Sequence, residues 1–206
     1  MGTSRIVVRP ATKADARELV RVLALAFEDD PQMIWMLPDP VDRQRRIRRM
    51  FLTVFRHEVF AFGGARVATE DGRIVGAALW IPPRSKAHPS VVRQVMAVPG
   101  FLRAFGRQIA RGNAFMLAAL KVHPHEKHWY LYIIGVDPEQ QGKGVGAALL
   151  RERLRHCDTE LMPAYLESSK LSNVPLYEHF GFEATGALAL PEGAPVVTTM
   201  WRTPQP

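Results

Sequence analysis

The residues from Trp129 to Cys157 read WYLYIIGVDPEQQGKGVGAALLRERLRHC, and the rest of the chain is organised around them. The first part, Trp129 to Val136, is apolar or aromatic except for Gly135. Alternate residues of a strand point to opposite faces, so this run predicts a strand with two apolar faces. Such a strand is buried on both sides, which predicts a central place in its sheet. One face would carry Trp129, Leu131 and Ile133, and the other Tyr130, Tyr132, Ile134 and Val136.

Three glycines follow this strand, at positions 142, 144 and 146, where a helix is predicted to begin. A glycine inside a helix costs about 1 kcal/mol relative to alanine, so these residues oppose the helix unless something must approach the backbone closely. The first N–H groups of a helix lack internal partners and bind phosphate well. Lys143 adds a positive charge, and the sequence therefore predicts a pyrophosphate site here. The apolar stripe of the helix consists of Ala147, Leu150, Leu154 and Cys157.

Three nucleotide-binding patterns compete for this loop. The phosphate loop of many nucleotide triphosphatases needs Ser or Thr after its lysine, but Gly144 follows Lys143. The dinucleotide fingerprint is met by Gly142, Gly144 and Ala147, and Glu167 lies 20 residues further on, where an acid would bind ribose. In that fingerprint the first glycine closes the strand directly, whereas five residues intervene here. An NAD(P)-dependent oxidoreductase remains an alternative.

The third pattern, Gln/Arg-x-x-Gly-x-Gly/Ala, is met by Gln141, Gly144 and Gly146. It resembles the acetyl-CoA loop of the GNAT superfamily of N-acetyltransferases. The resemblance extends to Val136-Asp137-Pro138 before the loop and to a later segment that contains Asn173, Tyr177-Glu178 and Gly181-Phe182. Within the superfamily, the segments PAYLESS and LYEHFGF look most like puromycin N-acetyltransferase and its relatives.

The resemblance implies an α/β fold with a mixed, twisted sheet of about seven strands and helices on both faces. It also implies that acetyl-CoA binds along the end of the strand and the glycine loop, with Asn173 near the pantetheine arm. No metal is implied. The implied cofactor-binding residues are Ile134, Gly135, Val136, Gln141, Gly142, Lys143, Gly144, Val145, Gly146, Ala147, Asn173 and Tyr177.

The same resemblance implies direct acetyl transfer to a primary amine, without a covalent enzyme intermediate. An alkylamine has a pKa near 10 and must lose a proton before it attacks, and we expect Glu167 to act as the base, directly or through water. A backbone N–H near Ile134 or Val136 would stabilise the oxyanion. Tyr177 would protonate the departing thiolate. Glu167 could instead be a structural carboxylate bound to backbone or to Lys170, and Tyr177 a core aromatic packed on its phenylalanine neighbours.

The acceptor is the least specified part of the sequence. We expect a small-molecule amine, with a protein or peptide amine as an alternative and a non-catalytic CoA-binding protein as another. Glu28-Asp29-Asp30-Pro31 ends the first helix, and its acids could attract a cationic amine. The proposed acceptor-binding residues are Phe27, Asp30, Trp35, Tyr132 and Glu167.

The whole chain, residues 1–206, is predicted to form a single domain. An N-terminal strand and two helices occupy 5–62, the second helix opening at Asp39-Pro40. Two strands, 65–69 and 74–81, flank the turn signal Asp71-Gly72. A central insertion, 82–128, is predicted to hold two helical pieces broken at Pro99-Gly100. The acetyl-CoA-binding core, 129–182, and a C-terminal hairpin, 182–202, complete the domain.

Several residues have a plain structural interpretation. The arginines between Arg43 and Arg49 are interpreted as a solvated helix face. His123, His125 and His128 are loosely spaced for a metal and lack cysteine partners, so a surface loop is favoured. Cys157 lies on an apolar stripe and is interpreted as a packing residue.

Composition limits the class of protein. The chain has 206 residues, of which 47% are hydrophobic and 23% charged, and this suits a globular domain with a sizeable core. It has one cysteine, no signal-peptide pattern and no apolar run of membrane-spanning length, so we expect a cytoplasmic protein. The net charge of +7 suits an acidic partner such as the phosphates of CoA. No nucleic-acid motif or basic stripe with aromatics is present. A monomer and a homodimer are both open.

Overall fold

The computed structural model describes residues 6–83 and 91–205 and contains a seven-stranded sheet in the order β1-β2-β3-β4-β5-β7-β6. Of the neighbouring strands, β4 and β5 run parallel and the other pairs are antiparallel. The predicted mixed sheet is therefore confirmed. A doubly wound dinucleotide-binding sheet would be parallel, so the oxidoreductase alternative does not fit. The strands are β1 (Val7–Pro10), β2 (Ala65–Glu70), β3 (Arg73–Ile81), β4 (Trp129–Val136), β5 (Ala164–Ser168), β6 (Glu183–Ala187) and β7 (Thr198–Arg202).

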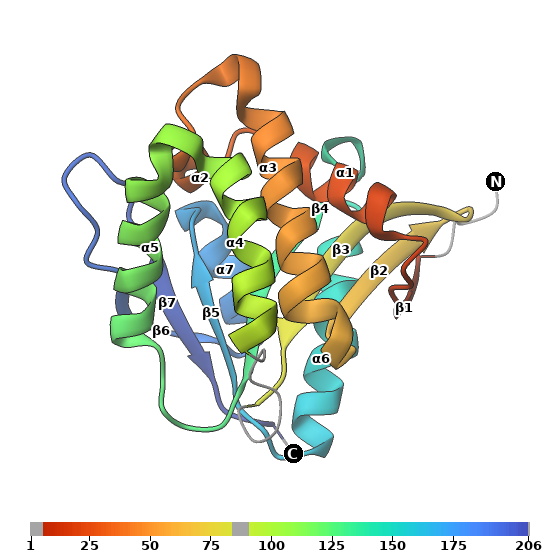
Figure 1. The fold of residues 1–206 in the computed structure, drawn as a ribbon. Coiled ribbons are helices and arrows are strands. Elements are labelled where there is room, and N and C mark those ends of the chain that lie inside the picture. The colour runs from red at the N-terminus through yellow and green to blue at the C-terminus, as the bar shows by residue number, and fades with distance from the viewer. Residues whose placement is uncertain (1–5, 84–90, 206) are drawn as a thin grey trace.

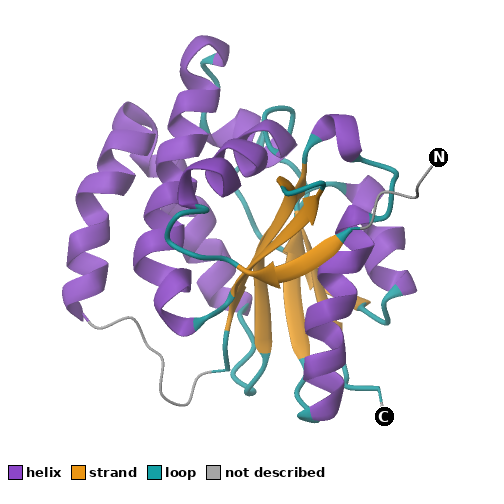
Figure 2. Cartoon of the chain, turned by 90° about the vertical axis from the view of Figure 1, so that its right-hand side faces the viewer, coloured by secondary structure: helices purple, strands orange, loops and turns teal. Residues whose placement is uncertain are grey.

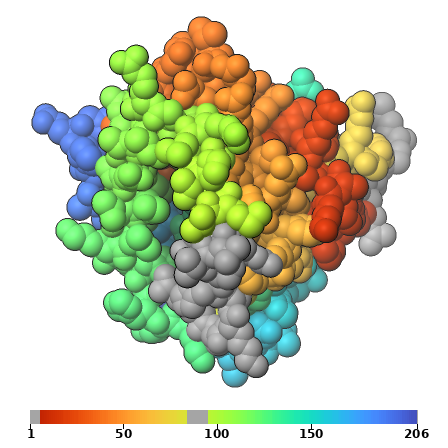
Figure 3. Space-filling view, viewed as in Figure 1, coloured from red at the N-terminus to blue at the C-terminus, as the bar shows by residue number. Residues whose placement is uncertain are grey.

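Helices cover both faces of this sheet (Figures 1 and 2). One face packs against α1 (Ala16–Ala26), α2 (Pro31–Met36), α3 (Pro40–Val54), α4 (Val91–Phe105) and α5 (Ile109–Val122). The other packs against α6 (Val145–Thr159) and α7 (Val174–His179). Side chains of α3, α4 and α5 form much of the outer surface on their side (Figure 3). The central strands therefore lie between two apolar layers, as the sequence of β4 predicts.

The two faces of β4 are not the ones predicted by simple alternation. The β3–β4 register pairs Leu79 with Ile133 but Trp80 with Leu131, so Tyr132 is an extra residue in a β-bulge. Tyr132 and Ile133 both pack toward α1 and α3, while Leu131 and Ile134 both pack toward α6. The predicted grouping of Ile133 with Trp129 and Leu131 is wrong, because the bulge shifts the alternation by one residue.

The bulge coincides with the point at which β4 and β5 separate. Their pairing ends at Leu131↔Leu166, whereas β4 continues beside β3 as far as Val136. β5 continues beside β7 to Ser168. No strand in the described part of the chain pairs with residues 132–136 on the β5 side, and this leaves backbone groups of a central strand available to a ligand.

The central insertion, 82–128, contains one break between helices, and it does not lie where the sequence predicted it. α4 runs through Pro99 and ends at Phe105, and the chain turns at Gly106, whose φ is +51°. α4 packs closely on α3, since a Cβ on Gly100 would lie 2.3 Å from Thr53 Oγ1. Tertiary packing thus holds a helix that proline alone would interrupt. The predicted break at Pro99-Gly100 is therefore wrong.

The arginine-rich part of α3 is also more than a solvated face. Arg46 Nη1 donates to the carbonyl oxygens of Ala104 and Phe105, at 3.2 and 3.1 Å. Arg43 donates to Leu37 O and Pro38 O. These carbonyls lie at helix ends that lack internal partners, so the arginines fasten α3 to its neighbours.

Other local predictions are confirmed. Asp39 caps α3 through Val41 N, with Pro40 in the first turn. Asp71 and Gly72, with φ of +49° and +78°, form the turn between β2 and β3, and β6 and β7 form the C-terminal hairpin. Cys157 is buried, and burial raises the pKa of its thiol to about 12, as suits a packing residue. In the described ranges, no helix combines the length and apolar character needed to cross a membrane.

Candidate active site

The glycine loop leaves its backbone open at the N-terminus of α6. A short turn, Pro138–Gln140, follows β4, and Gln141 Nε2 then donates to Val136 O at 3.3 Å. Gly142 and Gly144 have φ of +76° and +82°, a region that side chains with a Cβ rarely adopt. Gly144 is the N-cap of α6 and supplies no side-chain acceptor. The N–H groups that begin this helix are therefore free to bind an anion.

Gly146 has no such backbone reason to be glycine. A Cβ at Gly146 would be 3.6 Å from Val136 Cγ2, an ordinary contact. At Gly135, by contrast, a Cβ would lie 2.8 Å from Ala26 Cβ, so close packing of α1 on β4 explains that glycine. No residue that the structure describes requires glycine at position 146, so the start of α6 is open to close approach by a ligand. The loop thus fits the pyrophosphate of CoA.

The two predicted residues of the later motif lie on α7 and just before it. Asn173 is exposed, and its side chain makes no capping bond. Tyr177 is buried and packs edge-on against Phe182, with ring centroids 6.1 Å apart. Its hydroxyl has no hydrogen bond to any residue that the structure describes. Burial, and secondarily the charge of Asp30, raise the pKa of Tyr177, so the phenol is protonated at neutral pH. Tyr177 therefore combines the two features predicted as alternatives: its ring packs on Phe182, and its hydroxyl has no described partner.

Glu167 lies on β5 where this strand leaves β4. The Tyr130 hydroxyl donates a hydrogen bond to Glu167 Oε2, while Oε1 is buried without a hydrogen-bonding partner in the described chain. Burial raises the pKa of Glu167, and hydrogen bonding from Tyr130 and then Tyr165 opposes the rise. The carboxyl is held by a tyrosine of the neighbouring strand, rather than by the backbone or Lys170.

Sequence reasoning missed a second carboxyl near this site. Glu58 lies in a π-helical turn, Phe55–Val59, that continues α3, and burial raises its pKa to about 7. Tyr132 lies near both carboxyls: its pKa is raised by burial first and then by the charges of Glu58 and Glu167. The available signal was a lone acid in the segment FRHEVFAF, residues 55–62, which contains four apolar residues directly after it. π-turns are often found at functional sites.

The other proposed acceptor residues lie beside β4 but are largely engaged. Phe27 packs edge-on against Phe51, at 5.2 Å between ring centroids, and its ring borders Gly135. Trp35 is held by Arg111, which donates to its carbonyl at 2.6 Å and lies 5.7 Å from its ring centroid. Both aromatic rings therefore already pack against other residues of the protein.

Asp30 is more firmly engaged than the sequence suggests. It is 2% exposed and caps α2 by accepting from Gln32 N and Met33 N. Ser169 Oγ donates to its other oxygen at 2.6 Å. The acidic segment is thus followed by a helix, α2, that the sequence analysis did not predict. The Asp30 carboxylate caps the N-terminus of α2.

His123 and His128 belong to an aromatic cluster. The His128 ring packs edge-on against Tyr165 and Trp201, with centroids 5.6 and 5.4 Å apart. The His123 ring lies 5.0 Å from that of Tyr130 and 5.3 Å from that of Tyr165. Both residues lie in a loop, as predicted, but His128 is buried, so the surface interpretation is wrong for His128, because the loop folds back onto the sheet there. No group of three metal-ligating side chains occurs among residues 6–83 and 91–205.

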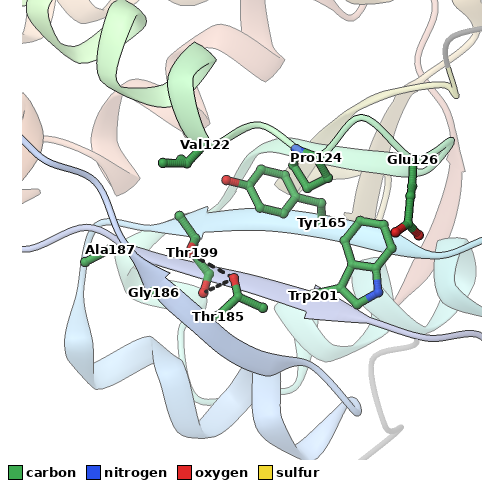
Figure 4. Close-up of a pocket in the computed structure, with 9 residues that line it drawn as sticks. All are labelled: Val122, Pro124, Glu126, Tyr165, Thr185, Gly186, Ala187, Thr199 and Trp201. Carbon is green, nitrogen blue, oxygen red and sulfur yellow. Dashed lines mark hydrogen bonds between the residues drawn. The ribbon is translucent and has the colours of Figure 1, made fainter.

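Two cavities adjoin the site, on the side away from the glycine loop. The larger, about 490 Å³, lies over β5, β7 and β6 beside the end of α5 (Figure 4). Tyr165, Thr199 and Trp201 contribute to its wall. The smaller, about 380 Å³, lies between the segment before α2, the loop after β5 and residues 195–196. The glycine loop itself is an open surface.

The sequence comparisons agree with this geometry. The model of the Acetyltransferase (GNAT) family matches residues 24–182. An uncharacterized N-acetyltransferase of Schizosaccharomyces pombe is 30% identical, over 82% of this chain and 70% of that protein. A mycothiol acetyltransferase of Acidothermus cellulolyticus is 37% identical over 86% of this chain. The chain spans only 44% of the length of that mycothiol enzyme.

Solved structures show the same fold. A histone acetyltransferase and related acetyltransferase from Corynebacterium glutamicum matches with a TM-score of 0.77 and 29% identity, over 99% of this chain and 98% of that one. A GNAT-family acetyltransferase from Brucella melitensis, in complex with acetyl-CoA, matches with a TM-score of 0.54 and 17% identity, over 99% of this chain and 91% of that one. With the divided strands β4 and β5 and the glycine loop at α6, these matches lead to one conclusion: the chain belongs to the GNAT family of acetyltransferases.

Proposed function

We propose that the protein transfers the acetyl group of acetyl-CoA directly to a primary amine of a small molecule. The observation that carries the proposal is the opening between β4 and β5. On one side it adjoins the free backbone of the glycine loop, and on the other a half-buried carboxyl, Glu167. A thioester and an amine bound from the two sides would meet at this opening.

The cofactor side suits the anionic part of acetyl-CoA. The N–H groups of residues 142–146 would bind the pyrophosphate, assisted by Lys143, whose ammonium is now 2.9 Å from Gln140 Oε1. The free edge of Ile134–Val136 would bind the pantetheine arm through backbone hydrogen bonds, and the exposed Asn173 would lie beside it. A backbone N–H of this edge would also stabilise the oxyanion as the amine attacks.

Glu167 would remove the proton of the amine. A protonated alkylamine cannot attack a thioester, and a base whose pKa lies closer to neutrality than that of an ordinary carboxyl is better matched to the task. Burial raises the pKa of Glu167 in this direction. Tyr130 holds one carboxylate oxygen, which leaves Oε1 to accept the proton directly or through water.

Tyr177 would give its proton to the departing thiolate. Its phenol is protonated at neutral pH, and its hydroxyl has no described partner that competes for the proton. Packing against Phe182 fixes the ring, so the donor is held in one orientation. Base and acid then come from opposite sides of β5: Glu167 from the face under α3, α4 and α5, and Tyr177 from the cluster under α6.

The small-molecule acceptor rests on the enclosed, carboxyl-containing surroundings of Glu167 and on the sequence resemblance to puromycin N-acetyltransferase and its relatives. The relatives described as mycothiol acetyltransferases are consistent with it. A protein amine is the second candidate, favoured by the Corynebacterium glutamicum structure described as a histone acetyltransferase. We further propose a cytoplasmic protein that acts as a monomer or homodimer.

An acceptor screen tests this function. Thiol release from acetyl-CoA would be measured with a panel of small primary amines, including arylalkylamines, diamines and amino-acid amides, and with lysine-containing and N-terminal peptides. Turnover with a small amine, and little or none with the peptides, is expected. Turnover restricted to peptides would contradict the small-molecule assignment.

A further inference from the structure

One face of the sheet carries a continuous row of aromatic and polar side chains next to Glu167. The register pairs Tyr130 with Tyr165 and Tyr165 with Trp201, so these three residues lie side by side on adjacent strands. Two positions along, Glu167 pairs with Thr199. Because side chains at i and i+2 share a face, Tyr165 and Glu167 point to the same side of β5. A molecule lying on Tyr165 and Trp201 is therefore next to the carboxyl.

The larger cavity opens over this row (Figure 4). Its floor contains Tyr165, Thr199 and Trp201, and Val122 and Pro124 close it from the end of α5 and the loop that follows. The hydroxyls of Thr185 and Thr199 are 3.0 Å apart and satisfy each other, so they compete little for a ligand. Its volume of about 490 Å³ lies within the range, roughly 300–1,000 Å³, of small-molecule sites.

Tyr165 connects this cavity with the reaction centre. Its ring lines the cavity and packs against the rings of His128 and Tyr130, with centroids 5.6 Å away in each case. Tyr165 is 1% exposed, and its hydroxyl lies close enough to the Glu167 carboxyl for each group to shift the pKa of the other. Neither the Tyr165 hydroxyl nor Glu167 Oε1 has a fully aligned hydrogen bond in the described chain. An amino group that reaches this pair can donate to both oxygens in place of their contact with each other.

The smaller cavity is less suited to the acceptor. Its wall contains both Asp29 and Lys170, so the opposite charges give a cationic amine no net attraction there. The cavity reaches β5 only through the loop from Ser169 to Ser172, beyond Glu167. Its lining contains no aromatic side chain.

We propose that the larger cavity binds the non-reacting end of the acceptor, and that this end is an aromatic or similarly flat apolar group joined by a short spacer to the primary amine. The ring would pack on Tyr165 and Trp201, since aromatic rings contact one another favourably edge-to-face and in offset stacks. The amino nitrogen would bond to the Tyr165 hydroxyl and to Glu167 Oε1. This inference rests on the proposed function and narrows its substrate to arylalkylamine-like compounds.

The test fills the cavity from two sides. Ala187 lies on β6 and Val122 at the end of α5, and both line the cavity and are outside the proposed catalytic groups. Ala187→Trp and Val122→Trp would each place an indole in the cavity. Ala184→Trp is the matched control, because Ala184 is exposed on the same strand but does not line the cavity. The probes are 2-phenylethylamine and ethylamine, which share an amine and differ in the ring.

Two readouts separate this inference from the proposed function. Calorimetry without acetyl-CoA should show that both cavity variants bind 2-phenylethylamine at least tenfold more weakly than the parent, with the control within twofold. In turnover, KM for 2-phenylethylamine should rise at least tenfold while the kinetics of ethylamine and KM for acetyl-CoA stay within twofold. If the parent fails to bind 2-phenylethylamine, or if a folded cavity variant binds it normally, the inference is wrong. If the parent binds it but acetylates no amine, the proposed function fails instead.

Discussion

The two sides of the β4–β5 opening are built in different ways. On the α6 side, the residues proposed for acetyl-CoA come from two short segments, 134–147 and 173–177, and the binding groups are largely backbone N–H. On the α3–α5 side, the groups proposed to face the acceptor are scattered along the chain: Glu58, Tyr130, Tyr165, Glu167 and Trp201. A backbone site leaves a local signature in glycine positions, whereas a side-chain site assembled across strands leaves none.

The two sides also differ in charge. The glycine loop presents a helix N-terminus and Lys143, which suit phosphate. The opposite side holds two half-buried carboxyls, Glu58 and Glu167, for which no ion pair is found in the described chain. This contrast in charge suits the proposed cosubstrate, which carries phosphates, on one side of the strand and the proposed amine on the other. Four predictions, the second of which uses two variants, test this contrast.

The largest effect is expected at Gly144. Gly144→Asp adds a side chain at a φ of +82° and a negative charge beside the phosphates, so acetyl-CoA affinity measured by calorimetry should fall at least 100-fold. Gly193→Asp is the matched control, because Gly193 has a φ of +79° and nothing near its would-be Cβ, yet lies in the β6–β7 connection. Unchanged affinity for Gly144→Asp would remove the loop from the site.

On the acceptor side, Glu167→Gln should lower kcat by about 100-fold, in the range typical of a lost general base. A base works when deprotonated, so parental activity should fall as the pH drops through the raised pKa of Glu167, above the usual carboxyl range. That acidic limb should be missing in the variant. Tyr130→Phe removes a hydrogen bond that lowers the pKa of Glu167, so the acidic limb of the pH–rate profile of this variant should move to higher pH. An identical pH–rate profile in all three proteins would rule out Glu167 as the base.

Tyr177→Phe tests the cofactor side with a smaller change, since it removes only a hydroxyl. We expect kcat to fall at least tenfold while the acetyl-CoA dissociation constant stays within twofold, because the ring continues to pack on Phe182. Single-turnover kinetics and calorimetry would separate the two quantities. A kcat within twofold of the parent would leave Tyr177 as a packing residue only.

The smallest effect is expected from Glu58→Gln, and it concerns stability. Burial raises the pKa of Glu58 to about 7 in the folded protein, from 4.5 in the unfolded chain. The folded state thus favours the neutral acid, and stability is lost as the pH rises from about 4.5 to about 7. Glutamine cannot ionise, so at pH 8 the variant should melt at a higher temperature than the parent, and its free energy of unfolding should exceed that of the parent by at most about 3 kcal/mol. Near pH 4 the two proteins should melt at the same temperature. A melting difference independent of pH would contradict the burial of this carboxyl.

The sequence by itself determined the central strand, the glycine loop at the start of α6 and the hairpin turns. These features depend on interactions within a few residues: alternating burial, proline without an N–H, and glycines at positive φ such as Gly142 and Gly144. The same local character explains why the family resemblance was concentrated in residues 129–182.

Only the tertiary structure decided the rest. The extra residue Tyr132 reversed the faces of β4 because pairing with β3 slips between Leu79 and Trp80, and no periodicity within β4 records its partner's register. α4 continues through Pro99 because α3 packs against it, and it ends at Phe105, where the chain turns at Gly106. Glu58 acquires its shifted pKa from the helices and strands that bury it. Burial and register depend on residues far apart in the chain, so the acceptor side could be recognised only once the strands were paired.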